Sequence, residues 1–231
     1  MHSFTVIASD SDYIFAWKPA GRASSRWSSF SLLDAIDEQT DPLWIGQRAI
    51  FWYDDEYGLL NRLDNETTGI VIFARSLAAK TQYQRLQDEW KMTKTYYATV
   101  YGQISWRFGW ITTPLYHHRD DLSRMTTDPE KGRGQAQEVI TYREKIVPSS
   151  QLLDPRNYDL GSRNTLVKVQ ITAGCRHQIR CHLASIGHPI IGDILYTGDF
   201  WKKYCKKRQI SLSSRLDLVS AGIEIATDIT V

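Results

Sequence analysis

The pattern of apolar and polar residues along the chain predicts five strands. Continuous apolar runs at residues 13–17 and 70–74 indicate buried strands. Residues 94–102, 139–146 and 164–171 are rich in β-forming residues or alternate in polarity, which is typical of half-buried strands. These five segments are the predicted sheet-forming part of the chain.

Helical spacing of apolar residues marks the predicted helices. Residues 32–36 indicate a short helix, and Ser76 is placed to cap a second one. The core face of the second helix carries four apolar residues, Ala79, Tyr83, Leu86 and Trp90. A third helix is predicted from Arg176, and Gly187 followed by Pro189 ends it.

Two segments combine basic residues with little regular pattern. Residues 114–137 predict a long basic loop, either a mobile surface connection or an arm that follows phosphate groups. Residues 202–208 predict a basic, aromatic helix-like segment, either a solvated face or an RNA contact. Residues 148–163 predict a further loop, and Lys18 in its Pro/Gly turn is expected to be solvated.

Composition and charge indicate a single globular domain in a reducing compartment. The 231 residues, of which 42% are hydrophobic, fit a single domain, 1–231. A net charge of +2 permits a polyanionic partner without demanding one. The three cysteines have no disulfide-scaffold spacing, so a reducing interior is expected. The first ten residues lack signal-peptide features and no apolar run reaches membrane-span length, so a cytoplasmic protein is expected.

The candidate chemistry starts from a carboxylate and from a cysteine–histidine cluster. Asp64 lies in a loop just before the strand at residues 70–74, where it is either a turn cap or a reactive group. Zinc has to be considered for the four neighbours Cys175, His177, Cys181 and His182. A structural zinc site usually needs a second, separated ligand pair, which the chain lacks. Glycine-rich phosphate-binding fingerprints are also absent, so no nucleotide cofactor is expected.

Several ordered motifs together resemble one known family. Residues 61–69, Asn-Arg-Leu-Asp-Asn-Glu-Thr-Thr-Gly, resemble the His-Arg-Leu-Asp-Arg-x-Thr-Ser-Gly signature of RluA-type RNA pseudouridine synthases. Residues 18–21 are similar to the family's Lys-Pro-x-Gly, and residues 94–102 to its tyrosine strand. Residues 174–184 resemble its Gly-Arg-x-His-Gln-Ile-Arg-x-His-Leu-Ala, and residues 188–193 its His-Pro-x-x-Gly-Asp. The motifs span about residues 13–198.

The resemblance implies a fold and a reaction. The implied fold is α+β, a mixed, largely antiparallel sheet with flanking helices and loops and a central RNA-binding cleft. The implied reaction converts a specific uridine of a structured RNA, rRNA or tRNA, into pseudouridine without cofactor or metal. A monomer is expected, with no membrane partner and no separate RNA-binding module before the catalytic domain.

The resemblance also assigns roles to individual residues. It implies catalytic roles for Asp64, for Tyr96 beside the target base, and for Arg180, which offsets the cost of burying the carboxylate. Arg62 matches the residue that fills or holds the space left by a flipped nucleotide. The other implied substrate-binding residues are Arg176, His177 and Ile179. Whether Asp64 acts as a nucleophile or removes the sugar C2′ proton stays open.

The chain departs from the family pattern at several positions. Asn61 replaces a histidine, Asn65 an arginine, Thr68 a serine and Cys175 an arginine, and Arg176 is expected to compensate for Cys175. Asn61, Asn65 and Cys175 therefore mark expected changes in RNA contact. An inactive RNA-binding protein on the same fold and a zinc-binding module are the alternative hypotheses.

Overall fold

The computed structural model describes residues 5–25, 31–38, 41–52, 54–146, 164–207 and 215–226. The chain forms two compact units, which we call unit 1 (Met1–Thr93 with Val219–Val231) and unit 2 (Lys94–Leu218). The loop predicted at residues 148–163 lies outside the described residues, as does Arg208 in the basic tail. Among the described residues, no helix is long and apolar enough to cross a membrane.

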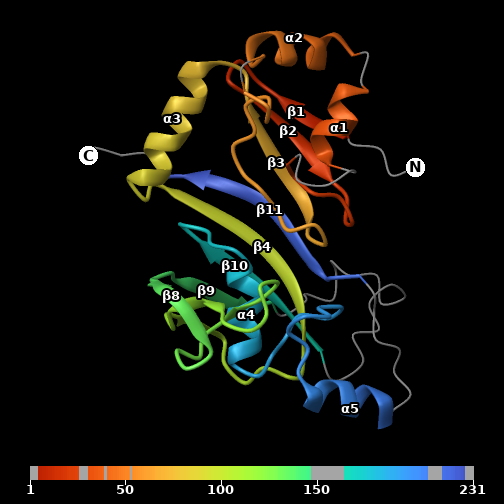
Figure 1. Ribbon diagram of the computed structural model, residues 1–231, viewed down its shortest axis with the longest axis vertical. Helices are drawn as coiled ribbons and strands as arrows, with labels where there is room; N and C mark the ends of the chain where they lie inside the picture. The colour runs from red at the N-terminus through yellow and green to blue at the C-terminus, as the bar shows by residue number, and fades with distance from the viewer. Residues whose placement is uncertain are drawn as a thin grey trace. The chain divides into compact units, whose positions relative to one another are not determined.

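Unit 1 is built on a short mixed sheet (Figure 1). Its strands lie in the order β1 (Thr5–Ser9), β2 (Tyr13–Lys18), β3 (Thr68–Ala74) and β11 (Leu218–Ile225). The first three strands are antiparallel, and β11 runs parallel to β3. The predicted strands at residues 13–17 and 70–74 are thus confirmed as neighbours.

Three helices flank this sheet: α1 (Leu32–Asp37), α2 (Pro42–Ile50) and α3 (Leu77–Asp88). Trp44 of α2 packs edge-on against Phe73, whereas α3 packs Tyr83 and Leu86 with Ile72. Because side chains alternate along a strand, Phe73 and Ile72 belong to opposite faces, so both faces of β3 are covered.

The predicted start of α3 is confirmed, but its predicted end is not. The Ser76 side chain accepts a hydrogen bond from the Ala79 N–H at 3.1 Å, as a cap should. The prediction that Trp90 lies on the core face of the helix is wrong. The helix ends at Asp88, and Trp90 has a left-handed φ of 59° and is 62% exposed.

Gly69 makes the close approach of β3 and β11 possible. Its φ is +124°, and a Cβ at this position would lie 2.2 Å from the backbone oxygen of Ser220. Any side chain would therefore separate the two strands directly after the loop that carries Asp64.

Unit 2 contains an antiparallel sheet (Figure 1). Its strands lie in the order β4 (Met92–Tyr101), β10 (Asn164–Ile171), β9 (Thr141–Lys145) and β5 (Phe108–Ile111). Along β10 every second residue is buried, as the sequence alternation predicts. The predicted strands at 94–102, 139–146 and 164–171 are confirmed, with small shifts of their ends.

The prediction of a long loop at residues 114–137 is wrong. This segment forms a second, three-stranded sheet in the order β7 (Met125–Thr126), β6 (Leu115–His118) and β8 (Gly132–Gln137). The strands are short and mostly polar, and β6 and β8 pair with a register shift, so little alternation is visible in the sequence. The buried apolar side chains Leu115 and Met125 anchor this sheet beside Cys181 and Tyr196.

Two helices complete unit 2, α4 (Gln178–Ser185) and α5 (Asp199–Lys207). The predicted helix after Arg176 is confirmed as α4, and Gly187 follows it with a left-handed φ of 84°. The helix-like reading of the basic tail is confirmed as α5. Six consecutive α4 residues, Gln178 to Leu183, are buried, so this helix is internal.

Candidate active site

The loop that carries Asp64 is fastened to the rest of unit 1 through its backbone. The Leu63 N–H donates to Ser24 Oγ at 2.9 Å, and the Ser24 hydroxyl donates back to the Leu63 carbonyl, also at 2.9 Å. Inside the loop, the Thr67 N–H donates to the Asp64 carbonyl at 3.0 Å. Asp64 itself is half-buried, and its neighbour Arg62 is exposed.

Lys18 is fully buried beneath this loop, so the expectation that it is solvated is wrong. Its ammonium donates to the carbonyls of Pro19, Arg22 and Asn65 at 3.1, 2.7 and 3.1 Å. Burial lowers the pKa of Lys18 to about 8, and the charges of Asp64 and Glu66 oppose that shift. The Lys18 ammonium thus places a buried positive charge beneath the loop. Three carbonyls hold it in place, and it interacts with the charge of Asp64, the predicted catalytic carboxylate.

Asn61 fastens the start of the loop to β3. Its side-chain oxygen accepts from the Ile72 N–H at 2.8 Å, and its amide donates to the Ile70 carbonyl at 3.2 Å. Asn61 is only 8% exposed, so in this structure its side chain serves the backbone of the loop. Its effect on RNA contact stays a prediction. Asn65 is exposed on the same loop, and its role in RNA contact stays a prediction.

Arg180 is held in a buried bidentate ion pair in unit 2. Its Nε lies 2.8 Å from Asp193 Oδ2, and its Nη2 lies 2.9 Å from Asp193 Oδ1. Both residues are nearly inaccessible, at 2% and 1% exposure. Planar two-point pairing fixes the guanidinium in one orientation, which is what a charge aimed at a substrate or carboxylate requires.

Tyr196 connects this ion pair to the start of α4 and to the small sheet. Its ring centroid lies 5.4 Å from the Arg180 guanidinium carbon. Its hydroxyl accepts from the Met125 N–H at 2.7 Å and lies 3.0 Å from His177 Nδ1. Since the Met125 bond uses an oxygen lone pair, the hydroxyl hydrogen is available to His177, whose φ of 53° is left-handed.

The cysteine–histidine cluster has a structural arrangement. His182 Nε2 donates to the Thr113 carbonyl at 2.9 Å, and its Nδ1 lies 2.7 Å from Thr141 Oγ1. Burial lowers the pKa of His182 and raises the pKa of the Cys181 thiol to about 12. In the described part of the chain, no group of three or more His, Cys, Asp or Glu residues is placed to hold a metal ion.

The remaining predicted site residues divide between the two units. Arg62 shares the Asp64 loop in unit 1, whereas Tyr96 and Ile179 are buried in unit 2, at 8% and 5% exposure. Arg176 donates to the carbonyls of Leu122 and Ser123 at 3.1 and 3.4 Å. It therefore joins the entry to α4 to the turn between β6 and β7.

Sequence reasoning passed over three residues of this arrangement. Asp193 closes the His-Pro-x-x-Gly-Asp motif, so its motif position could have pointed to it. Lys18 begins the Lys-Pro-x-Gly motif, so its motif position could have pointed to it as well. Tyr196 has no comparable signal, because its contact with Met125 joins distant segments.

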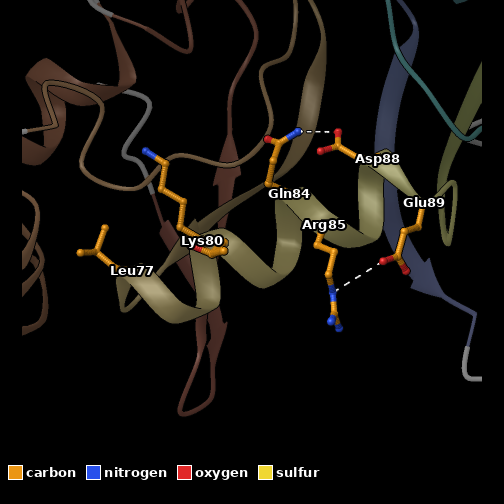
Figure 2. Close-up of a pocket in the computed structure, with 7 residues that line it drawn as sticks. Leu77, Lys80, Gln84, Arg85, Asp88 and Glu89 are labelled. Carbon is orange, nitrogen blue, oxygen red and sulfur yellow. Dashed lines mark hydrogen bonds and ion pairs between the residues drawn. The ribbon is translucent and has the colours of Figure 1, made fainter.

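An open pocket of about 750 Å³ lies on α3, away from the predicted site residues. Figure 2 shows its lining, in which Gln84 donates to Asp88 at 2.9 Å and Arg85 pairs with Glu89 at 3.8 Å. These are i,i+4 pairs along one helix surface, a usual arrangement for a solvated face. None of the predicted catalytic residues lines it.

A comparison with models of protein families identifies the family of this chain. A model described as RNA pseudouridylate synthase matches residues 12–185. The chain therefore belongs to the RNA pseudouridylate synthase family, and the RluA-type resemblance of its motifs is confirmed.

Two curated relatives are similar over nearly the whole chain. An uncharacterized RNA pseudouridine synthase of Aquifex aeolicus is 30% identical over 94% of the chain. The dual-specificity RNA pseudouridine synthase RluA of Vibrio vulnificus is 26% identical over 95% of it. The chain spans 62% of the length of the first relative and 77% of the second.

A solved structure, human RNA pseudouridylate synthase domain containing 1, shares the fold. It superposes with a TM-score of 0.68 at 19% identity, covering 98% of this chain and 80% of the human chain. The predicted α+β class with a mixed, mostly antiparallel sheet is confirmed.

Proposed function

We propose that this protein isomerises a uridine to pseudouridine in a structured RNA, with Asp64 as its catalytic carboxylate. The main support is the family match, which covers both the Asp64 loop and α4. The second support is the way the loop is built. Lys18, Ser24 and Asn61 hold its backbone, so the carboxylate is attached to a rigid support.

The reaction needs no external co-reactant. The bond between N1 and C1′ breaks, the uracil turns, and C5 bonds to C1′. C5 then loses its proton and N1 gains one, so atoms and charge balance. Asp64 assists either as a nucleophile or by removing the C2′ proton.

The other site residues serve the flipped nucleotide in this proposal. Arg180, which Asp193 orients, is the cation that offsets the cost of keeping Asp64 ionised during the reaction, as the family resemblance implies. Tyr96 packs on the base and handles the C5 proton, and Ile179 gives an apolar floor. Arg62 occupies the space that the nucleotide leaves, while Arg176 and His177 contact the RNA near the start of α4.

The proposed setting is that of a cytoplasmic enzyme that acts alone. It would work as a monomer in a single catalytic domain, without metal or nucleotide cofactor. Its substrate would be rRNA or tRNA. The Vibrio vulnificus relative carries the name of a dual-specificity enzyme, which supports testing both RNA classes.

Pseudouridine mapping tests the proposal directly. Total RNA from cells with and without the gene is mapped at single-nucleotide resolution, and the sites are then rebuilt in vitro with the purified protein. We expect at least one site that disappears with the gene and returns with the wild-type protein only. RNA binding without any such site would instead support the inactive RNA-binding alternative.

A further inference from the structure

The surface of α5 has a composition unlike that of the other helices. Four of its nine residues are lysines, Lys202, Lys203, Lys206 and Lys207, and all four are exposed. Asp199 is its only acidic residue, so the helix carries a net charge of +3. Within the described residues, none of these lysines forms an ion pair, so their charges are available to a partner.

The inner side of α5 is firmly attached to unit 2. Trp201 stacks on Tyr101 of β4, with ring centroids 5.3 Å apart and planes inclined by 22°. Its indole N–H donates to the Gly187 carbonyl at 3.1 Å, and Cys205, one turn later, is 1% exposed. The lysines therefore extend from a fixed helix rather than from a loose tail.

The outer side of α5 also presents aromatic rings. Phe200 is 69% exposed, although leaving a phenyl ring in water is unfavourable. Tyr204 lies one turn further on, with its ring centroid 6.4 Å from that of Phe200 and an interplanar angle of 26°. Lys203 and Lys207 follow Phe200 at i+3 and i+7, so the cations and the exposed ring share one face.

We propose that this face of α5 binds an unpaired segment of the substrate RNA, an inference that rests on the proposed function. Lys203 and Lys207 contact phosphates, and Phe200 stacks on an unpaired base beside them. Cationic side chains that follow a backbone next to an aromatic platform are the usual means of holding single strands. A duplex offers phosphates but no free base face, so the aromatic ring favours a single strand.

The lysine-rich face of α5 lies close in sequence to Asp193, the residue that orients Arg180. α5 begins at Asp199, six residues after Asp193, the partner of Arg180. The Thr197 N–H between them donates to the Asp193 carbonyl at 3.0 Å. RNA held by α5 is thus held by the same segment that orients Arg180, which suits a contact close to the target nucleotide.

Fluorescence anisotropy with a labelled 20-nucleotide oligouridylate, and with a 20-base-pair RNA duplex for comparison, tests this surface. Phe200→Leu keeps an apolar side chain but removes the ring. We expect it to weaken oligouridylate binding at least about fivefold, since base–aromatic stacking contributes about 1–3 kcal/mol. The duplex should lose less than twofold. Unchanged oligouridylate affinity, or an equal loss for the duplex, would overturn the stacking contact.

The lysines are tested separately through salt dependence. Lys203→Gln/Lys207→Gln should reduce the slope of log K against log salt by about 1.4, because each single-strand phosphate contact contributes about 0.7. Arg85→Gln/Lys91→Gln, near the end of α3, removes the same charge elsewhere and should leave the slope unchanged. Equal slopes in both double variants would contradict the proposal.

The outcome separates this inference from the proposed function. If wild-type protein forms pseudouridine and the α5 variants bind and turn over RNA as the wild type does, only the α5 inference fails. If wild-type protein binds oligouridylate through α5 but forms no pseudouridine in any cellular RNA, only the proposed function fails.

Discussion

Arg180 and Asp193 form a bidentate ion pair, 2.8 and 2.9 Å long, in the interior of unit 2. The pair links α4 to the segment that follows it, and Asp193 also accepts from the backbone N–H groups of Leu195 and Tyr196 at 3.0 and 3.1 Å. The orientation of the proposed catalytic arginine therefore depends on a carboxylate that is not among the proposed catalytic residues.

A double-mutant cycle measures this dependence. Removing one partner of a buried pair leaves the other charge uncompensated, which typically costs about 3–5 kcal/mol. Arg180→Met and Asp193→Asn should each show such a loss in urea unfolding. The double variant should lose clearly less than the sum of the two, because neither charge then remains. Additive losses would contradict the coupling.

Tyr196→Phe tests the link from the small sheet to the site. It retains the ring beside Arg180 but removes the hydroxyl that accepts from the Met125 N–H. A buried donor without a partner costs about 1–3 kcal/mol, so unfolding free energy should fall by that amount. The loss of the His177 contact should lower kcat more than it raises KM. Unchanged kcat at reduced stability would restrict Tyr196 to a structural role.

Asn61→Ala should destabilise unit 1, because it leaves one buried backbone N–H without a hydrogen-bond acceptor. Ile72 loses the acceptor for its buried N–H, at an expected cost of about 1–3 kcal/mol in unfolding free energy. Asn65→Ala removes the same side chain from an exposed position of the loop, and should stay within about 0.5 kcal/mol of wild type. Equal effects of the two substitutions would contradict the assignment of Asn61 as the residue that fastens the loop.

The lowered pKa of Lys18 predicts that activity and stability change in opposite directions as the pH rises. Its pKa is about 8 in the folded protein, against an ordinary value of 10.5. Between these values the unfolded chain binds more protons than the folded one, so the contribution of Lys18 to the free energy of unfolding rises with pH. Activity should fall over the same range, because the neutral amine has two hydrogens for three carbonyls and no charge beside Asp64.

Lys18→Met separates this effect from other titrations. The variant should have a lower rate at pH 7 and no loss of rate near pH 8, measured by single-turnover pseudouridine formation. An alkaline limb near pH 8 that persists unchanged in Lys18→Met would contradict the assignment.

Local pattern predicted much of the fold, and the failures have physical causes. β10 was predictable because one face is buried and every second residue is apolar or small. The small sheet was not, because its strands are short, mostly polar and partly buried, and β6 and β8 pair with a register shift, so no regular alternation marks them. Trp90 follows the helical period but lies beyond Asp88, where the chain has already turned.

The sequence motifs predicted the proposed catalytic residues of the candidate site, but not the contacts that hold those residues in place. Asp64 and Arg180 stand in motifs that can be compared position by position. Lys18 contacts the carbonyl of Asn65, 47 residues away, and Tyr196 contacts Met125 across 71 residues. No local pattern encodes such contacts, so the structural roles of these residues emerge only from the folded chain.

The most direct test of the account is the single-turnover rate of Asp64→Asn on an RNA that the wild-type protein modifies, measured with the affinity for the same RNA. We expect pseudouridine formation to fall at least about 100-fold while affinity changes less than about threefold, because the substitution removes the reactive group and preserves the shape of the loop. Glu66→Gln, an equal loss of charge at an exposed position of the same loop, should retain most of the rate. Turnover by Asp64→Asn at the rate of Glu66→Gln would contradict the central claim.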